Sequence, residues 1–113
     1  MDGQELIAFL KDDVLMMLQK QVYKDFELLS NRFPDNFLEE NYSLDEIRFI
    51  IKDNLTFVME KNESKTLQLF YTIDIPEKQF LSLVSNENPI ENLSEAILLR
   101  EAQKVYFRMK YSK

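Results

Sequence analysis

Residues 55–75 read LTFVMEKNESKTLQLFYTIDI, and the way this stretch folds decides the class of the whole protein. Its second half alternates between two sets of side chains: Leu67, Leu69, Tyr71, Ile73 and Ile75, with Thr66, Gln68, Phe70, Thr72 and Asp74 between them. Alternation with period two, in aromatic and β-branched residue types, is typical of a half-buried strand. The sequence therefore predicts a β-hairpin over about 55–75, with NESK (residues 62–65) as its connection.

The segment before the hairpin predicts a short helix. Ser43 is followed three positions later by Glu46, which is the spacing of a capping box at a helix start. Residues 44–53 then place four aliphatic side chains on one helical face: Leu44, Ile47, Ile50 and Ile51. The same stripe can be extended as a helix to residue 61. In that case the protein would be all-α, which is the alternative to the hairpin.

Long helices are expected at both ends of the chain. From Gln4 to about Asn31 no proline and no glycine interrupts a run of strong helix formers, so one long first helix is expected. Its apolar residues cover more than one face, which is typical of a helix that is central to a core or shared with a partner. Pro76 ends the hairpin and opens a short helix. A final helix is expected over about 90–111.

These elements together predict a helix-rich α+β fold in one compact domain spanning residues 1–113. A chain of 113 residues is long enough for one core and too short for two. With 45% hydrophobic residues, including nine Phe and five Tyr, the composition is far from that of a disordered chain. Because two strands alone make a marginal sheet, the hairpin must be covered by helices or extended by a second copy.

The residue types exclude several kinds of chemistry. The absence of Cys and His removes disulfides, thiolate nucleophiles, structural zinc and the commonest general acid/base. Gly3 is the only glycine, so no glycine-rich phosphate loop can form. Neighbouring carboxylates such as Glu39 and Glu40 would diverge by about 100° on a helix, as expected of solvated surface. We therefore expect no enzyme activity, no catalytic residue, no cofactor, no metal and no small-molecule ligand.

The N-terminal segment and the apolar runs bear on location. The N-terminus, MDGQELIAFLKDD, is acidic before its first apolar run and does not resemble a signal peptide. No apolar stretch approaches the roughly 20 residues that span a bilayer. We expect a soluble, cytoplasmic protein that does not engage a membrane.

The last twenty residues, SEAILLREAQKVYFRMKYSK (94–113), differ in charge from the rest of the chain. They carry five basic and two acidic side chains, whereas residues 1–93 carry nine basic and eighteen acidic ones. On a helical wheel one arc is apolar and is expected to face the core: Leu98, Ala102, Val105 and Met109. A basic–aromatic ridge lies roughly opposite and is formed by Arg100, Lys104, Phe107, Arg108 and Tyr111. These five are the candidate partner-binding residues.

Two interpretations of the basic–aromatic ridge stay open. As a contact surface it would offer cations to an anionic partner and aromatic rings as desolvated anchors. As an ordinary helix face its cations would favour the helix dipole, or pair with acidic residues of the first helix within one molecule or across a dimer. Nucleic acid is the less favoured partner, because a body of net charge −9 opposes three ridge cations.

The function expected from these features is that of a small acidic, non-enzymatic protein-binding module of the adaptor, chaperone, immunity or inhibitor type. Its partner would be another protein or a second copy of itself, in the simplest case as a homodimer. The alternatives are a nucleic-acid-associated regulator that uses the ridge, and a small enzyme that relies on carboxylates or lysine alone.

Overall fold

The protein is all-α in a computed structural model that describes residues 3–111, apart from the side chain of Asp12. Six helices occur in this range: α1 (Gly3–Phe9), α2 (Asp12–Phe26), α3 (Leu44–Lys61), α4 (Glu63–Ile73), α5 (Glu77–Val84) and α6 (Pro89–Tyr111). No strand is present among the described residues. The expected α+β fold is therefore wrong, and the all-α alternative fits.

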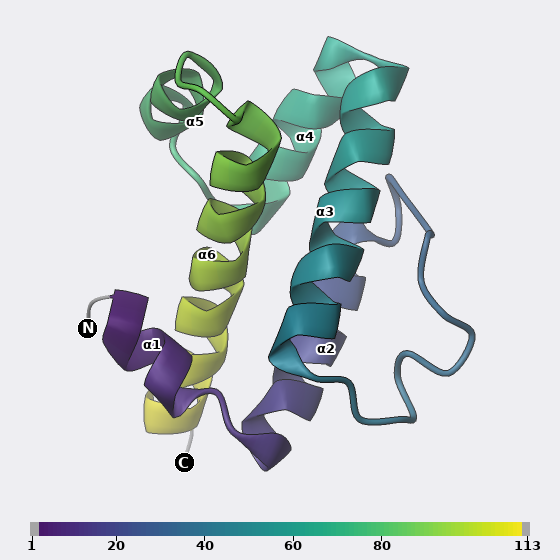
Figure 1. Cartoon of the computed structure of the whole chain (residues 1–113), viewed down its shortest axis with the longest axis vertical. Coiled ribbons are helices and arrows are strands. Elements are labelled where there is room, and N and C mark those ends of the chain that lie inside the picture. The colour runs from purple at the N-terminus through teal and green to yellow at the C-terminus, as the bar shows by residue number, and fades with distance from the viewer. Residues whose placement is uncertain (1–2, 112–113) are drawn as a thin grey trace.

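Helix α6 is the centre of the molecule, because it packs against all five other helices. α1 and α5 lie along one flank of α6, near its two ends, whereas α2 and α3 lie along the opposite flank (Figure 1). Its buried face is correspondingly wide: Leu93, Ile97, Leu98, Glu101, Ala102 and Val105. The final helix expected over about 90–111 is confirmed, and its first residue is a proline, which fits the first helical position well.

Residues 55–75 form the end of α3 and the whole of α4 instead of a hairpin. The buried side chains of α4 recur at helical spacing: Thr66, Leu69, Phe70 and Ile73. Tyr71, which a strand would place with the inward set, is 73% exposed. Apolar residues are so frequent here that the sequence satisfies both periods, and packing against α2, α3 and α6 selects the helical one.

Two side-chain caps explain where α3 and α4 begin. The predicted capping box is confirmed: Glu46 N donates to Ser43 Oγ (3.1 Å), and Ser43 N donates to Glu46 Oε1 (2.8 Å). α3 continues past residue 53 and stops at Asn62, whose backbone is extended. The Asn62 side chain then accepts a hydrogen bond from Lys65 N (2.7 Å) and caps α4. A cap thus occupies the place where the hairpin connection was expected.

The single helix expected over residues 4–31 is also wrong, because α1 and α2 are separated by a break at Leu10 and Lys11. Lys11 has an extended backbone (φ −118°, ψ 177°) and its N–H bonds to Phe9 O. The break lets α1 pack on α6, where the rings of Phe9 and Tyr106 meet edge to face with centroids 5.3 Å apart. The break changes the direction of the chain, so that α1 buries apolar side chains against α6 while α2 buries its own within the bundle.

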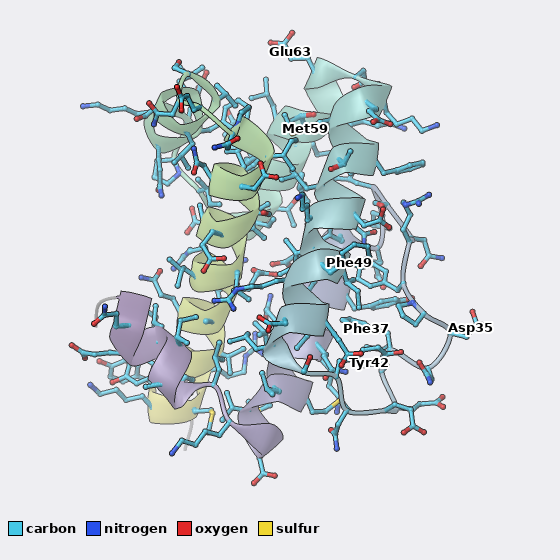
Figure 2. All side chains as sticks on the ribbon, in the orientation of Figure 1. Asp35, Phe37, Tyr42, Phe49, Met59 and Glu63 are labelled. Atoms are coloured by element: carbon cyan, nitrogen blue, oxygen red, sulfur yellow. The ribbon has the colours of Figure 1, made fainter. Side chains whose placement is uncertain are left out.

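The loop of residues 27–43 between α2 and α3 is fastened to α2 by one buried amide. Gln19 Nε2 donates to Phe37 O (2.7 Å) and Glu40 O (2.9 Å), and Gln19 Oε1 accepts from Tyr42 N (2.9 Å). Because Gln19 is fully buried, these bonds also satisfy the polar atoms of its own amide. Figure 2 shows Phe37 and Tyr42 beside the helices and Asp35 at the outer edge of the loop.

A second buried amide holds the start of the same loop against α3. Asn54 Oδ1 accepts from Ser30 Oγ (2.6 Å) and Arg32 N (3.1 Å), and Asn54 Nδ2 donates to Arg32 O (3.0 Å). The loop is therefore a fixed part of the fold although it has no regular secondary structure.

Helix α5, predicted as a short helix after Pro76, is confirmed but differs from the other helices in its burial. None of its residues is buried, and it contributes only half-buried side chains to the core: Phe80, Leu83 and Val84. The other five helices all contribute buried residues to one hydrophobic cluster. None of the helices within residues 3–111 combines the length and the apolar content required to cross a bilayer.

Candidate functional site

The five residues of the basic–aromatic ridge occupy three different environments. Arg100 lies beside the connection between α4 and α5. Lys104 contacts buried carboxyl groups of the bundle. Phe107 and Tyr111 are exposed at the end of α6, with Arg108 between them in the sequence. The structure therefore does not bring the five together as one free surface.

Arg100 holds the end of α4. Its Nη2 lies 2.8 Å from Asp74 Oδ2, and its Nε donates to Asp74 O at 3.2 Å. Asp74 adopts a left-handed backbone (φ 71°), which ends α4, and its own N–H bonds to Phe70 O. The guanidinium thus neutralises the carboxylate of a residue that terminates a helix. This role accounts for Arg100 without any partner.

A cleft of about 720 Å³ lies next to Arg100, between α5 and α6. It is lined by apolar side chains such as Leu83 and Leu99 and by amide side chains such as Gln79 and Gln103. Its charges are already compensated, because Arg100 pairs with Asp74 and Glu95 pairs with Arg48 (3.3 Å). The charged side chains that line the cleft are therefore all in ion pairs.

Lys104 belongs to a buried polar cluster formed by Gln21, Asp25, Glu101 and Lys104. Lys104 Nζ lies 2.7 Å from Asp25 Oδ2 and 3.3 Å from Glu101 Oε1. Gln21 Nε2 donates to the same Asp25 oxygen at 3.0 Å, and the Arg108 guanidinium donates to Gln21 Oε1. Lys104 also donates to Thr72 O (3.3 Å), so the cluster joins α2, α4 and α6.

Glu101 is the most perturbed group of this cluster. It is fully buried, and neither of its carboxyl oxygens has a hydrogen-bond partner as an acceptor. Burial, and after it the neighbouring Asp25 carboxyl, raise the pKa of Glu101 to about 9 against the opposing effect of Lys104. Glu101 is therefore a neutral acid at pH 7, and its hydroxyl can donate a hydrogen bond to Asp25.

A buried carboxyl group with a raised pKa beside a second carboxyl group resembles an arrangement that enzymes use for acid–base chemistry. Here Glu101 is fully buried, and the large cleft beside Arg100 is lined by other residues. Among the described residues, no three carboxylates lie close enough to hold a metal ion. The cluster joins α2, α4 and α6.

Three members of this cluster were not predicted from the sequence: Gln21, Asp25 and Glu101. Gln21 and Asp25 lie four residues apart on α2, next to the fully buried Val22 and Phe26, and Glu101 interrupts the apolar arc of α6. Polar residues on otherwise apolar helical faces were the available signal. Met109, expected in the core-facing arc, is instead exposed at the end of α6.

The last two turns of α6 carry the most exposed apolar side chains of that helix. Phe107 and Tyr111 are 46% and 68% exposed, and their rings stack with centroids 6.1 Å apart and an interplanar angle of 24°. We call Phe107, Arg108, Met109, Lys110 and Tyr111 the C-terminal surface. Lys110 Nζ lies 5.5 Å from the ring centre of Tyr111, and a hydrogen bond with Tyr106 raises the pKa of Lys110.

The two cations of the C-terminal surface remain available. Arg108 bonds to Gln21, a neutral side chain, and Lys110 lies over the rings of Tyr106 and Tyr111. Neither forms an ion pair with a carboxylate in the part of the chain that the structure describes. This surface therefore combines two stacked rings, one thioether and two uncompensated positive charges.

Comparison of the chain with models of known families, with curated proteins and with solved structures gives no match. Function therefore has to be inferred from the geometry of the chain itself.

Proposed function

We propose that this protein is a non-enzymatic protein-binding module and that the C-terminal surface is its contact site. The observation that carries the proposal is the exposed, stacked pair of Phe107 and Tyr111 beside two cations that no carboxylate compensates. Elsewhere on α6 the large aliphatic side chains are buried or half-buried.

The residue types of this surface suit protein recognition. Aromatic residues and arginine are enriched among the side chains that contribute most to protein–protein affinity. Because the Phe107 and Tyr111 rings already stack on each other, binding would immobilise less side-chain freedom than it would for separate rings. The two cations would favour an acidic partner with an apolar recess and would increase the rate of association with it.

The contacts of Arg100 and Lys104 weigh against a nucleic-acid partner. Both cations are paired with carboxylates of the same chain, Asp74 and Asp25, so phosphate binding would have to break these pairs. Of the three ridge cations only Arg108 is left without an ion pair in the described chain. One such charge on a protein of net charge −6 is a weak basis for binding phosphates.

The experiment is capture of partners from the native cells with the double variant Phe107→Ala/Tyr111→Ala. We expect this variant to lose its specific partner by at least about 10-fold, because both aromatic anchors are removed. The matched control is Phe49→Ala/Tyr71→Ala, which removes the same two ring types at positions that are 71% and 73% exposed on other helices. The control should capture the partner as the unaltered protein does.

Charge provides a second arm of the same experiment. Arg108→Glu/Lys110→Glu should slow association with the captured partner and weaken the dependence of the association rate on salt. Circular dichroism of each variant must match that of the unaltered protein. Equal capture by the aromatic variant and by its control would remove the C-terminal surface from consideration.

A further inference from the structure

We propose that the partner of the C-terminal surface is a second copy of this chain, which receives it in a hollow on the loop between α2 and α3. This inference rests on the proposed function, because it identifies the partner of the same surface. Its contact joins two different patches, so copies would associate head to tail.

Five of the eight residues that line the receiving hollow are apolar or aromatic, and polar atoms make up most of its exposed surface. It has a volume of about 290 Å³, and its apolar lining consists of Tyr23, Phe33, Pro34, Phe37 and Leu38. An apolar cavity of about 150 Å³ accepts benzene, so this hollow has room for an aromatic ring such as that of Phe107. Leu38 remains 40% exposed beside it, and a docked ring would cover this side chain.

The charges around the hollow are opposite to those of the C-terminal surface. Asp35 and Glu39 line the hollow, and Glu40 follows directly in the sequence. All three side chains are exposed, and none forms an ion pair within the described residues. A rim with these uncompensated carboxylates complements a surface with two uncompensated cations, Arg108 and Lys110.

The larger cleft between α5 and α6 is a poorer match for the same surface. Its carboxylates, Asp74 and Glu95, are already paired with Arg100 and Arg48, so incoming cations would have to displace existing partners. Aromatic residues do not line it, whereas three rings line the loop hollow. The charge argument therefore selects the loop.

The hollow is formed before any partner arrives. The Phe33 ring lies 5.0 Å from the Phe37 ring and 5.1 Å from the Tyr23 ring, measured between centroids. Gln19 fixes the backbone of Phe37 and Glu40 from beneath. A fixed receptor loses little conformational entropy when it binds, which favours a contact of modest size.

The two patches lie on opposite sides of the molecule. The end of α6 lies beside α1 in Figure 1, and Asp35 marks the far edge of the loop in Figure 2. One molecule therefore cannot close the contact on itself. A head-to-tail contact of this kind builds a closed ring if the rotation between copies closes, and otherwise an open chain with one free patch at each end.

Charge reversal at both patches tests the contact directly. Self-association is measured by sedimentation velocity at protein concentrations up to about 1 mM. The measurement is made at physiological salt, where charges more than about 8 Å apart are screened. The unaltered protein should self-associate in a concentration-dependent way. Arg108→Glu/Lys110→Glu and Asp35→Lys/Glu39→Lys should each weaken association at least about 10-fold. The combination of all four changes should restore it.

The combined variant has the same net charge as the unaltered protein, −6, because the two reversals shift the charge equally in opposite directions. Restoration would therefore report contact between the patches and not a change in overall repulsion. Glu60→Lys/Glu87→Lys is the control for the loop variant, since both residues are exposed and lie outside the hollow. If Arg108→Glu disturbs the fold through Gln21, the milder pair Lys110→Glu and Asp35→Lys replaces it.

Three results would overturn the inference: a strict monomer at about 1 mM, self-association that survives both reversals, or no restoration in the combined variant. A monomer that still captures another protein through Phe107 and Tyr111 would overturn the second-copy inference and leave the proposed function standing. A monomer whose partners are unaffected by Phe107→Ala/Tyr111→Ala would remove both.

Discussion

Lys104 of α6 lies 2.7 Å from Asp25 of α2, and this ion pair joins the last helix of the chain to an early one across the bundle. The side chains of Lys104 and Asp25 are only 18% and 7% exposed, so water compensates neither charge well. Removing one member of such a pair costs more than the pair contributes, because the remaining charge stays buried without its partner.

The variant Lys104→Met should therefore be clearly less stable than the unaltered protein. We expect the free energy of unfolding to fall by about 3 kcal/mol, measured by denaturant titration at neutral pH. Lys78→Met is the control, since Lys78 is exposed and its change should stay within about 0.5 kcal/mol. Equal stabilities of the two variants would contradict a structural role for the Lys104–Asp25 pair.

The raised pKa of Glu101 makes the stability depend on pH in a defined direction. In the folded protein the pKa is about 9, against an ordinary value of 4.5, so the folded state keeps a proton that the unfolded state releases. The contribution of this group is complete below about pH 4.5 and falls by about 1.4 kcal/mol per pH unit as the pH rises toward 9.

The variant Glu101→Gln should lose this slope, because glutamine is neutral at every pH and its amide can still donate a hydrogen bond to Asp25. Unfolding free energies measured between about pH 6 and pH 8 should therefore fall less steeply in Glu101→Gln than in the unaltered protein. Glu95→Gln is a control on the same helix, since Glu95 is partly exposed and paired with Arg48. Parallel pH profiles for Glu101→Gln and the unaltered protein would show that Glu101 is ionised when folded.

We expect Gln19 to be the residue that contributes most to holding the α2–α3 loop against α2. Gln19→Ala removes three hydrogen bonds to the loop backbone and leaves the buried carbonyl of Phe37 without this partner. We expect a loss of about 3 kcal/mol in unfolding free energy and faster proteolysis within residues 31–43. Gln68→Ala, at an exposed position of α4, should change neither quantity. Unchanged proteolysis of Gln19→Ala would contradict this role.

The Asn62 cap of α4 should contribute to the stability of the protein although it lies at an exposed junction. Asn62→Ala removes the side chain that accepts from Lys65 N, and we expect it to lower the unfolding free energy by about 1 kcal/mol. Asn41→Ala, in the exposed part of the loop, is the matched control. Asn62 caps the first turn of α4. Circular dichroism should therefore also show less helix in the Asn62 variant than in the control as the temperature rises. A larger loss of stability in Asn41→Ala than in Asn62→Ala would contradict the role of Asn62 as a cap.

Several elements could be predicted because their signals lie within a few residues of one another. The capping box at Ser43 and Glu46, the helix after Pro76 and the long final helix all depend on local backbone hydrogen bonding or on fixed proline geometry. Such signals need no knowledge of what packs against the segment.

The hairpin prediction failed for the opposite reason. Residues 66–75 contain apolar side chains at both strand and helix spacing, and sequence alone cannot tell which subset will be buried. Packing on α2, α3 and α6 buries Leu69 and Ile73 together with Phe70, and leaves Tyr71 in water. The break at Lys11 escaped prediction likewise, because it is set by the packing of α1 on α6.

The basic–aromatic ridge shows the same division within one helix. The sequence by itself determined that α6 would be helical, that residues 94–113 would be basic against an acidic body, and that the five ridge residues would share one side. Only the tertiary structure decided which of these cations remain free, because Asp25 and Asp74 lie 79 and 26 residues away from Lys104 and Arg100 along the chain. Coulomb attraction depends on distance in space, and folding alone brings those carboxylates within 3 Å.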